Sequence, residues 1–388
     1  MLVTTSGDKA STTLGEGFRA LSSIREDVWH SEKKAGAYEW WYFDAVSDDG
    51  RETLVVIFLD GFIFSPRYNR AVKEYMAGSH GVHDGNAPQP GDFPALAVSL
   101  YRDGRLAWRA INEYEPGDFA AETNRPACRI GSNSFELDTA TGENVYRLQL
   151  DCSLRGKRKL QASLAWIVED CDFTSGDEAD ARGGVTSAHE WNLAAPRCRV
   201  KGTINIVEPN GARDEREWTG TGYHDHNLDT RWMPATIAEW QWGRAHFADA
   251  TAIFYRYREQ ENACITTRLY VVRGGELKMY EPQFVASKWR RHFFGLRYPR
   301  AIEIKAVGDE GAQPSLRPSL RIEQRSIVDS SFFYLRFTGE AELDLGDGVV
   351  RRAVAVTEQL APRALQWRGL WWLTGLRIGR RDRASFLP

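Results

Sequence analysis

The sequence has little cysteine and no marked excess of charge, and these shortages exclude several classes of protein. Its 388 residues contain 5 cysteines without a C-x-x-C pair, so we expect neither a disulfide framework nor a cysteine-ligated zinc site. The formal net charge of −3 gives no basic surplus, so we expect no nucleic-acid partner. Phosphate-loop, dinucleotide-binding and nucleophile-elbow motifs are also missing, and no cofactor is therefore expected.

Long apolar runs are missing too. No stretch reaches the roughly 18 apolar residues that a membrane-spanning helix needs. The segment from Met1 to about Ile24 is polar and lacks the apolar run of a secretory signal. With 42% hydrophobic and 27% charged residues, the composition is that of an ordinary globular chain, and we expect a cytoplasmic protein.

Aromatic residues are abundant by contrast, with 14 Trp, 18 Phe and 14 Tyr. This number indicates either a cavity lined by aromatic rings or a core that is rich in large rings. The composition alone leaves both interpretations open.

The pattern of turns and strands predicts an all-β chain. Turn dipeptides that supply the positive φ of tight hairpins recur between segments rich in β-branched and aromatic residues. The turns are Asp49-Gly50, Asp103-Gly104, Asn210-Gly211, Gly274-Gly275 and Asp347-Gly348. The predicted strands are Thr53 to Phe58, Ala95 to Tyr101, Leu160 to Ile167, Ala250 to Arg256, Thr267 to Val272 and Ser331 to Phe337.

Helices are expected to be few and short, the best candidate running from Ser65 to Met76 behind a Ser cap and a Pro at the first position. The segments Met76 to Phe93 and Asp170 to Gly184 are predicted to be loops. Because a chain of this length usually forms more than one core, we expect two antiparallel β-barrel domains in tandem, 1–208 and 209–388.

Four short segments combine aromatic rings with groups that titrate or form hydrogen bonds. They are residues 39–44 (EWWYFD), 189–191 (HEW), 220–227 (GTGYHDHN) and 239–244 (EWQWGR). Side chains alternate between the two faces of a strand. We therefore expect Tyr223, Asp225 and Asn227 on one face and His224 and His226 on the other.

The His224-x-His226 pair could ligate zinc, but the sequence indicates no third ligand, so we expect no metal. The alternative is that both imidazoles bond to neighbouring backbone or carboxylates, with Asp229 as a candidate partner.

Asp225 is the candidate proton donor. A carboxyl that lies among Tyr, Trp and Phe side chains is poorly solvated, which raises its pKa and keeps it protonated near neutrality. The alternative is a buried Asp that caps a loop or pairs with Arg244.

Together these four segments resemble the carotenoid 1,2-hydratase (hydroxyneurosporene synthase) family, over residues 36 to 360. The resemblance implies a tandem of lipocalin-like β-barrels and a cofactor-free addition of water across an isoprenoid double bond. It assigns catalytic roles to Asp225, His189, Trp191 and Tyr223. We assign substrate binding to a second set of residues: Trp41, Trp240, Trp242, Arg244 and Asn227.

Two other outcomes stay open for the same cavity. The cation formed by protonation could be captured by a second alkene, which would make the protein a cyclase, and a cavity that only folds a polyene would make it a pericyclase. A carrier that binds a hydrophobic ligand without reacting is the non-catalytic alternative.

A hydrophobic substrate suggests transient association with a membrane surface. Two segments mix basic and aromatic residues as interfacial anchors do, namely 288–294 (KWRRHFF) and 367–373 (WRGLWWL), the second followed by Arg377, Arg380, Arg381 and Arg383. A solvated basic face with its aromatic rings turned to the core is the alternative. The sequence does not indicate an oligomeric state.

Overall fold

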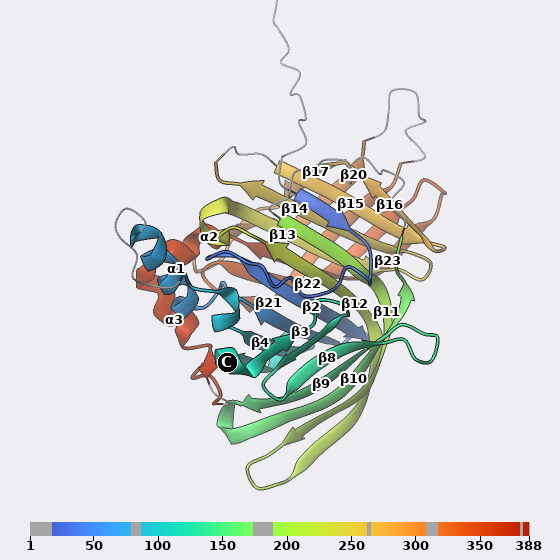
Figure 1. Cartoon of the computed structure of the whole chain (residues 1–388). Helices are drawn as coiled ribbons and strands as arrows, with labels where there is room; N and C mark the ends of the chain where they lie inside the picture. Colours follow the sequence, from blue (N-terminus) through green and yellow to red (C-terminus); the bar gives the residue numbers. More distant parts are fainter. Residues whose placement is uncertain are drawn as a thin grey trace, which may run out of the picture.

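The computed structural model describes residues 18–78, 87–173, 189–261, 265–307, 317–380 and 383–387. Strands dominate these residues and form two large curled sheets, which lie one above the other in Figure 1. The all-β prediction with few short helices is therefore confirmed.

The first sheet has 13 strands in the order β24-β5-β4-β3-β2-β12-β11-β10-β9-β8-β7-β6, with β1 paired to β11. Its pairings are antiparallel apart from β1 with β11 and β24 with β5. The strands are β1 (Phe18–Leu21), β2 (Tyr38–Ser47), β3 (Glu52–Asp60), β4 (Ala95–Arg102), β5 (Arg105–Glu113), β6 (Phe119–Ala121), β7 (Ala127–Ile130), β8 (Asn133–Asp138), β9 (Val145–Leu154), β10 (Arg158–Asp170), β11 (His189–Val207), β12 (Arg213–Asp229) and β24 (Gly379–Arg380).

The second sheet has 9 strands in the order β16-β15-β14-β13-β23-β22-β21-β20-β17, and β18 and β19 form a separate pair. These strands are β13 (Ile237–His246), β14 (Thr251–Glu259), β15 (Ile265–Arg273), β16 (Glu276–Tyr280), β17 (Pro282–Ser287), β18 (Arg290–Arg291), β19 (Arg297–Tyr298), β20 (Ala301–Ala306), β21 (Ser319–Ser330), β22 (Tyr334–Asp344) and β23 (Val350–Leu360).

The helices are α1 (Pro66–Gly78), α2 (Met233–Thr236) and α3 (Trp371–Gly375), with short 3₁₀ turns at Pro90–Asp92, Pro116–Asp118, Arg155–Lys157, Pro362–Gln366 and Arg368–Leu370. The expected helix after Ser65 is confirmed, and the Ser65 hydroxyl accepts a bond from the Arg67 backbone N–H at 3.0 Å. Figure 1 places α1 and α3 together at one edge of the molecule.

The predicted turns are confirmed, since each turn dipeptide joins two neighbouring strands and its glycine has a positive φ. The last predicted strand begins later than expected, at Tyr334. Residues 79–86 of the first predicted loop and 174–184 of the second lie outside the described residues.

The chain passes from the first sheet to the second between Asp229 and Ile237. The boundary expected at residues 208 and 209 falls inside the hairpin between β11 and β12, so β12 lies in the first sheet. Near the C-terminus, β24 returns to the first sheet. The division into two domains stays a prediction.

Strand alternation sorts most of the buried side chains into three cores, one in each sheet and one between the sheets. One face of β2 places Trp41 and Phe43 in the core of the first sheet, whereas Trp40 and Tyr42 point to the region between the sheets. The second sheet has a core of its own, which includes Phe254. The region between the sheets is therefore the place where both halves contribute side chains.

Gly220 lets β12 approach β2 closely. A Cβ atom at this position would lie 2.2 Å from the carbonyl oxygen of Val46, an atom that cannot move away without shifting β2. We expect Gly220→Ala to lower the free energy of unfolding by about 1–3 kcal/mol, the usual cost of overpacking. Urea unfolding followed by tryptophan fluorescence measures it. Gly117→Ala, whose new Cβ meets nothing within 4 Å, is the control, and equal stability of the two variants would contradict the expectation.

Candidate active site

A cavity of about 590 Å³ lies between the two sheets. Most of its lining is apolar, and it includes Trp40, Tyr42 and Leu59 from the first sheet and Trp240 and Trp242 from the second. Ligand cavities of this kind are mostly apolar with a few convergent polar groups. The expected aromatic-lined cavity is therefore present, and it lies between the sheets.

Asp225 and Asn227 are the polar groups of β12 that line this cavity, and Asp225 is the one that titrates. Its Oδ2 accepts hydrogen bonds from the Trp191 indole N–H at 2.9 Å and the Tyr223 hydroxyl at 2.6 Å. Its Oδ1 accepts a bond from the Asn227 amide at 2.9 Å. Burial raises the pKa of Asp225 to about 7, although the bonds from Trp191 and Tyr223 lower it. The structure agrees with the expected raised pKa.

Aromatic rings surround this carboxyl. Trp240 stacks on Trp40 with a centroid distance of 5.4 Å, and Trp242 meets Tyr42 edge-on at 5.4 Å. Trp242 also lies 5.2 Å from the ring of Tyr223. The walls near Asp225 thus present π-faces and edges to whatever the cavity holds.

A second carboxyl, Glu358, lines the same cavity and pairs with the buried guanidinium of Arg336. Burial raises the pKa of Glu358, and the charge of Arg336 opposes this rise. The Arg336 guanidinium also donates to the Tyr42 hydroxyl at 2.7 Å and pairs with Asp44 at 3.2 Å. These charges lie beside the candidate acid.

The sequence analysis missed Glu358 and Arg336. No local motif marks them, because they come from β22 and β23, more than a hundred residues after Asp225. Tyr42 lies inside the segment 39–44 that we singled out, so strand alternation could have identified it.

Arg244 does not pair with Asp225. Its guanidinium is buried against Asp44, with Nη2 at 2.6 Å from Oδ1. This contact joins β13 of the second sheet to β2 of the first. The alternative of an Asp225–Arg244 pair is therefore wrong, and Arg244 is not among the residues that line the cavity.

His189 and Trp191 lie on the same face of β11, next to one another on the side of the second sheet. The His189 ring contacts the Tyr255 hydroxyl, and its Nδ1 lies 3.3 Å from Asp229. The ring of Tyr255 stacks on Trp191 with centroids 4.8 Å apart. Trp191 thus contacts the Asp225 carboxyl directly, whereas His189 contacts the Tyr255 ring that packs on Trp191.

Trp41 lies away from the cavity. It points into the core of the first sheet, where its ring stacks on His226 at 4.7 Å. Adjacent strand residues face opposite sides, so Trp40 occupies the cavity position. Among the residues assigned to substrate binding, Trp240, Trp242 and Asn227 line the cavity, and Trp41 and Arg244 do not.

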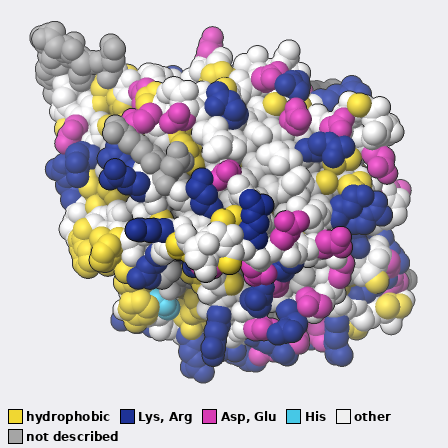
Figure 2. Space-filling view, turned by 90° about the horizontal axis from the view of Figure 1, so that it is seen from below, with side chains coloured by type: hydrophobic (Ala, Val, Ile, Leu, Met, Phe, Trp, Pro, Cys, Tyr) yellow, Lys and Arg dark blue, Asp and Glu magenta, His cyan; other side chains and the backbone are white. Residues whose placement is uncertain are grey.

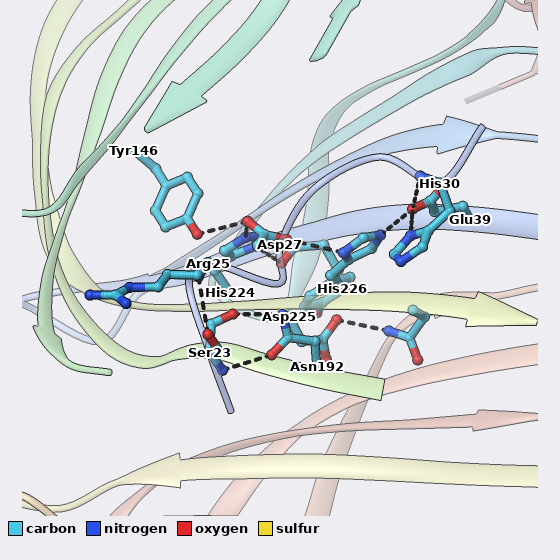
Figure 3. A network of polar contacts seen from close by, with 12 residues as sticks. Ser23, Arg25, Asp27, His30, Glu39, Tyr146, Asn192, His224, Asp225 and His226 are labelled. Carbon is cyan, nitrogen blue, oxygen red and sulfur yellow. Dashed lines mark hydrogen bonds and ion pairs between the residues drawn. The ribbon is translucent and has the colours of Figure 1, made fainter. Parts of the chain in front are cut away.

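His224 and His226 face the first core, opposite to Asp225, as expected. Figure 3 shows the polar network that they form. His224 bonds to Asp27 at 2.8 Å, and His226 bridges Asp27 at 3.2 Å and Glu39 at 2.8 Å. Their carboxylate partners are therefore Asp27 and Glu39, whereas Asp229 pairs with Arg231.

Charge within this network is balanced by pairing. Burial would lower the pKa of His226, but the bonds to Asp27 and Glu39 outweigh it and raise the pKa to about 9. Burial would raise the pKa of Asp27, yet contact with His224 lowers it to about 2. An imidazolium held between two carboxylates ties β12 to β2 and to the segment before it.

His30, Glu39 and His226 bring three potential metal ligands together, their donor atoms all within 4.8 Å. The Lys33 ammonium, however, lies 2.5 Å from Glu39 and also pairs with Asp60. Both imidazoles already bond to the same oxygen of Glu39. A divalent cation would have to displace these bonds beside a buried positive charge. We therefore assign the cluster a structural role, and the expected lack of a metal stays a prediction.

A group of ion pairs connects the two sheets at a part of the cavity wall away from Asp225. Arg109 of β5 pairs with Asp329 of β21 at 2.5 Å, and Arg377 pairs with the same carboxylate at 2.7 Å. Tyr101 donates to Asp329 at 3.1 Å. These groups connect the two sheets and the C-terminal segment at that end.

In the part of the chain that the structure describes, no helix has the length and apolar character needed to cross a bilayer.

Two curled antiparallel sheets with an apolar cavity between them define the chain as a lipocalin-like all-β protein. Solved structures share this fold. An AttH protein from Nitrosomonas europaea superposes with a TM-score of 0.59 at 15% identity, covering 91% of this chain and 99% of that one. CghA superposes with a TM-score of 0.58 at 12% identity, covering 89% of this chain and 94% of that one. At such identities the likeness concerns the fold alone.

The family model described as carotenoid hydratase CrtC matches residues 177–386, which is more than half of the sequence. The chain belongs to this family.

The chain is also similar in sequence to two curated proteins. Hydroxyneurosporene dehydrogenase of Chlorobaculum tepidum is 29% identical over 366 residues, covering 93% of this chain and 92% of that one. Acyclic carotenoid 1,2-hydratase of Rubrivivax gelatinosus is 29% identical over 229 residues, covering 58% of this chain. The chain spans only half of the latter protein's length, 50%.

The raised pKa of Asp225 predicts a carboxyl that loses its proton near pH 7. Infrared difference spectra should contain a protonated-carboxyl band that disappears with a midpoint near pH 7. Asp225→Asn should remove this band. Glu358→Gln, which changes the other carboxyl of raised pKa in the cavity, should keep the band but lower its midpoint, because the charge of Glu358 raises the pKa of Asp225. A band that survives in Asp225→Asn would contradict the assignment.

Proposed function

We propose that this chain is a hydratase that adds water across a carbon–carbon double bond of a hydrophobic, isoprenoid or carotenoid-like substrate, with Asp225 as the acid and no cofactor. Family membership supports a hydratase. The observation that carries the acid role is a carboxyl with a pKa of about 7 at the wall of an apolar cavity. A general acid works best when its pKa lies near the working pH.

The reaction needs two steps. In the first, the carboxyl O–H bond of Asp225 breaks, a C–H bond forms at one alkene carbon, and the π electrons leave a tertiary cation at the other. In the second, a water oxygen forms the C–O bond with that cation, and the aspartate takes a proton from the water. Alkene and water thus give a tertiary alcohol, and Asp225 ends protonated again.

The hydrogen bonds around Asp225 suit this role. Oδ2 already accepts from both Trp191 and Tyr223, whereas Oδ1 accepts only from Asn227. Oδ1 is therefore the oxygen that can hold the reactive proton. We propose Tyr223 and Trp191 as positioning residues that fix the carboxyl rotamer, and His189 as a residue that holds Tyr255 against Trp191.

The aromatic walls suit a cationic intermediate. A cation within about 6 Å of a ring centroid is attracted by the π-face, and this attraction grows when water is excluded. Trp240, Trp242 and Tyr42 line the cavity and supply such rings. The mostly apolar lining favours a hydrocarbon chain, which agrees with the carotenoid named for the relatives.

Loss of the acid should stop hydration. We expect Asp225→Asn to slow product formation by about 10²–10⁴-fold, the usual contribution of a positioned acid. The test incubates both proteins with an acyclic carotenoid in buffered D₂O and measures by mass spectrometry the gain of water and of carbon-bound deuterium. Deuterium without added water would favour a cyclase or isomerase, and unchanged ligand bound to both proteins would favour a carrier. Either result would overturn the proposal.

The Tyr223 hydroxyl should shift the alkaline limit of activity that the titration of Asp225 sets. Only protonated Asp225 can donate, so the rate should fall as pH rises through about 7. The bond from Tyr223 lowers the pKa of Asp225, so its removal in Tyr223→Phe raises that pKa further and moves the alkaline limit to higher pH. Rates measured across pH test this shift, with Tyr298→Phe on β19 as the control. A limit that moves to lower pH in Tyr223→Phe would contradict the assignment.

A further inference from the structure

Exposed Trp and Phe side chains of the described residues are confined to two segments. They are Trp289 and Phe293 in residues 288–300, and Trp367, Trp372 and Phe386 in residues 362–387, and we call these five side chains the aromatic rim. Phe293 is 79% exposed, Phe386 73%, Trp367 63% and Trp372 60%. The other large hydrophobic side chains that are exposed in the described residues are those of Val, Ile and Met, such as Val349 and Val350 at a hairpin of the second sheet.

Three members of the aromatic rim, Phe293, Trp372 and Phe386, lie in or next to residues that line the cavity. Phe293 itself lines the cavity, as do Leu373 and Leu387, the chain neighbours of Trp372 and Phe386. Leu373 and Phe294 also pack against the small cluster of Phe332, Phe333 and Leu365. The two segments, distant in sequence, therefore meet where the cavity reaches the surface.

Both segments are strongly basic in a chain that is otherwise acidic. Residues 288–300 contain five Lys and Arg and no Asp or Glu, and residues 362–388 contain six Arg and one Asp, whereas the whole chain has a net charge of −3. Arg290, Arg291 and Arg363 form no ion pair with any other described residue. Their charge is therefore available to a partner. Figure 2 shows hydrophobic and basic side chains gathered at the edge where Figure 1 places α1 and α3.

We infer that the aromatic rim is a docking surface for a bilayer that contains anionic lipids, through which a hydrophobic substrate passes directly into the cavity. Trp and Phe insert at the boundary between headgroups and acyl chains, and arginines beside them pair with anionic headgroups. The direction of substrate passage rests on the proposed function, whereas docking itself depends only on the rim.

Vesicle flotation tests the docking. The full chain should float with phosphatidylcholine vesicles that contain phosphatidylglycerol and should bind pure phosphatidylcholine vesicles at least about tenfold more weakly. Raising the salt from about 0.15 M to about 1 M shortens the Debye length from about 8 Å to about 3 Å and should release most of the bound protein.

Variants identify the surface. Trp367→Ser combined with Trp372→Ser and Phe386→Ser should reduce vesicle binding at least about tenfold, as should Arg290→Glu with Arg291→Glu. Val349→Ser with Val350→Ser controls for lost exposed apolar surface, and Arg321→Glu with Arg352→Glu controls for charge; both should bind as the unchanged protein does. Circular dichroism and thermal melting check that every variant is folded.

The outcomes separate docking from catalysis. The rim variants should lose activity on substrate embedded in anionic vesicles and keep it on substrate in detergent micelles, whereas Asp225→Asn should float normally and lose both activities. Rim variants that bind vesicles as well as their controls do would overturn the docking surface. A chain that binds no vesicle and dimerises in solution through the rim would also overturn it, in favour of a second copy as the partner.

Discussion

The Asp44 carboxylate holds the two sheets together beside the cavity. It lies on β2 of the first sheet and pairs with Arg244 at 2.6 Å and Arg336 at 3.2 Å, both from the second. All three side chains are buried. Desolvation of such charges is costly, and removal of one partner typically costs about 3–5 kcal/mol because the other charges stay buried and unpaired. The pairing therefore fixes how the sheets lie on one another, and with it the shape of the cavity.

Two consecutive residues of β12 show how this arrangement sets the chemistry of each face. Asp225 points between the sheets into apolar surroundings, where burial raises its pKa to about 7. His226 points into the first core, where Asp27 and Glu39 raise its pKa to about 9. One residue is thus held near the midpoint of its titration while its neighbour stays charged. Asp27 and Glu39 hold β12 through His224 and His226, on the face opposite to Asp225. Asp225 itself pairs with no cation among the described residues, and such a partner would lower its pKa.

The sequence predicted the features that depend only on neighbouring residues, such as turns, helix caps and the alternation of side chains along a strand. Turn glycines identified the hairpins, Ser65 and Pro66 identified α1, and the alternation along residues 223–227 separated Asp225 from the two histidines. The sequence pattern could not show which face of a strand points to the cavity. We therefore predicted that Trp41 binds substrate, although its neighbour Trp40 lines the cavity. Long-range partners could not be predicted from local pattern. Arg336 and Glu358 come to the cavity from β22 and β23, and Asp27 comes to His224 and His226 from the segment before β2, all far from β12 in sequence.

In the proposed reaction, the apolar cavity that raises the pKa of Asp225 would also favour return of the proton from the cation to the aspartate. After proton transfer, an aspartate and a carbocation would face each other with little water between them, and their attraction at low dielectric is strong. Proton return would then compete with capture by water, and we propose that the rings of Trp240 and Trp242 stabilise the cation while the hydrogen bonds from Trp191 and Tyr223 stabilise the aspartate. Those two bonds strengthen as the carboxyl becomes an anion. The same donors that moderate the pKa of the acid thus favour the charged state along the reaction.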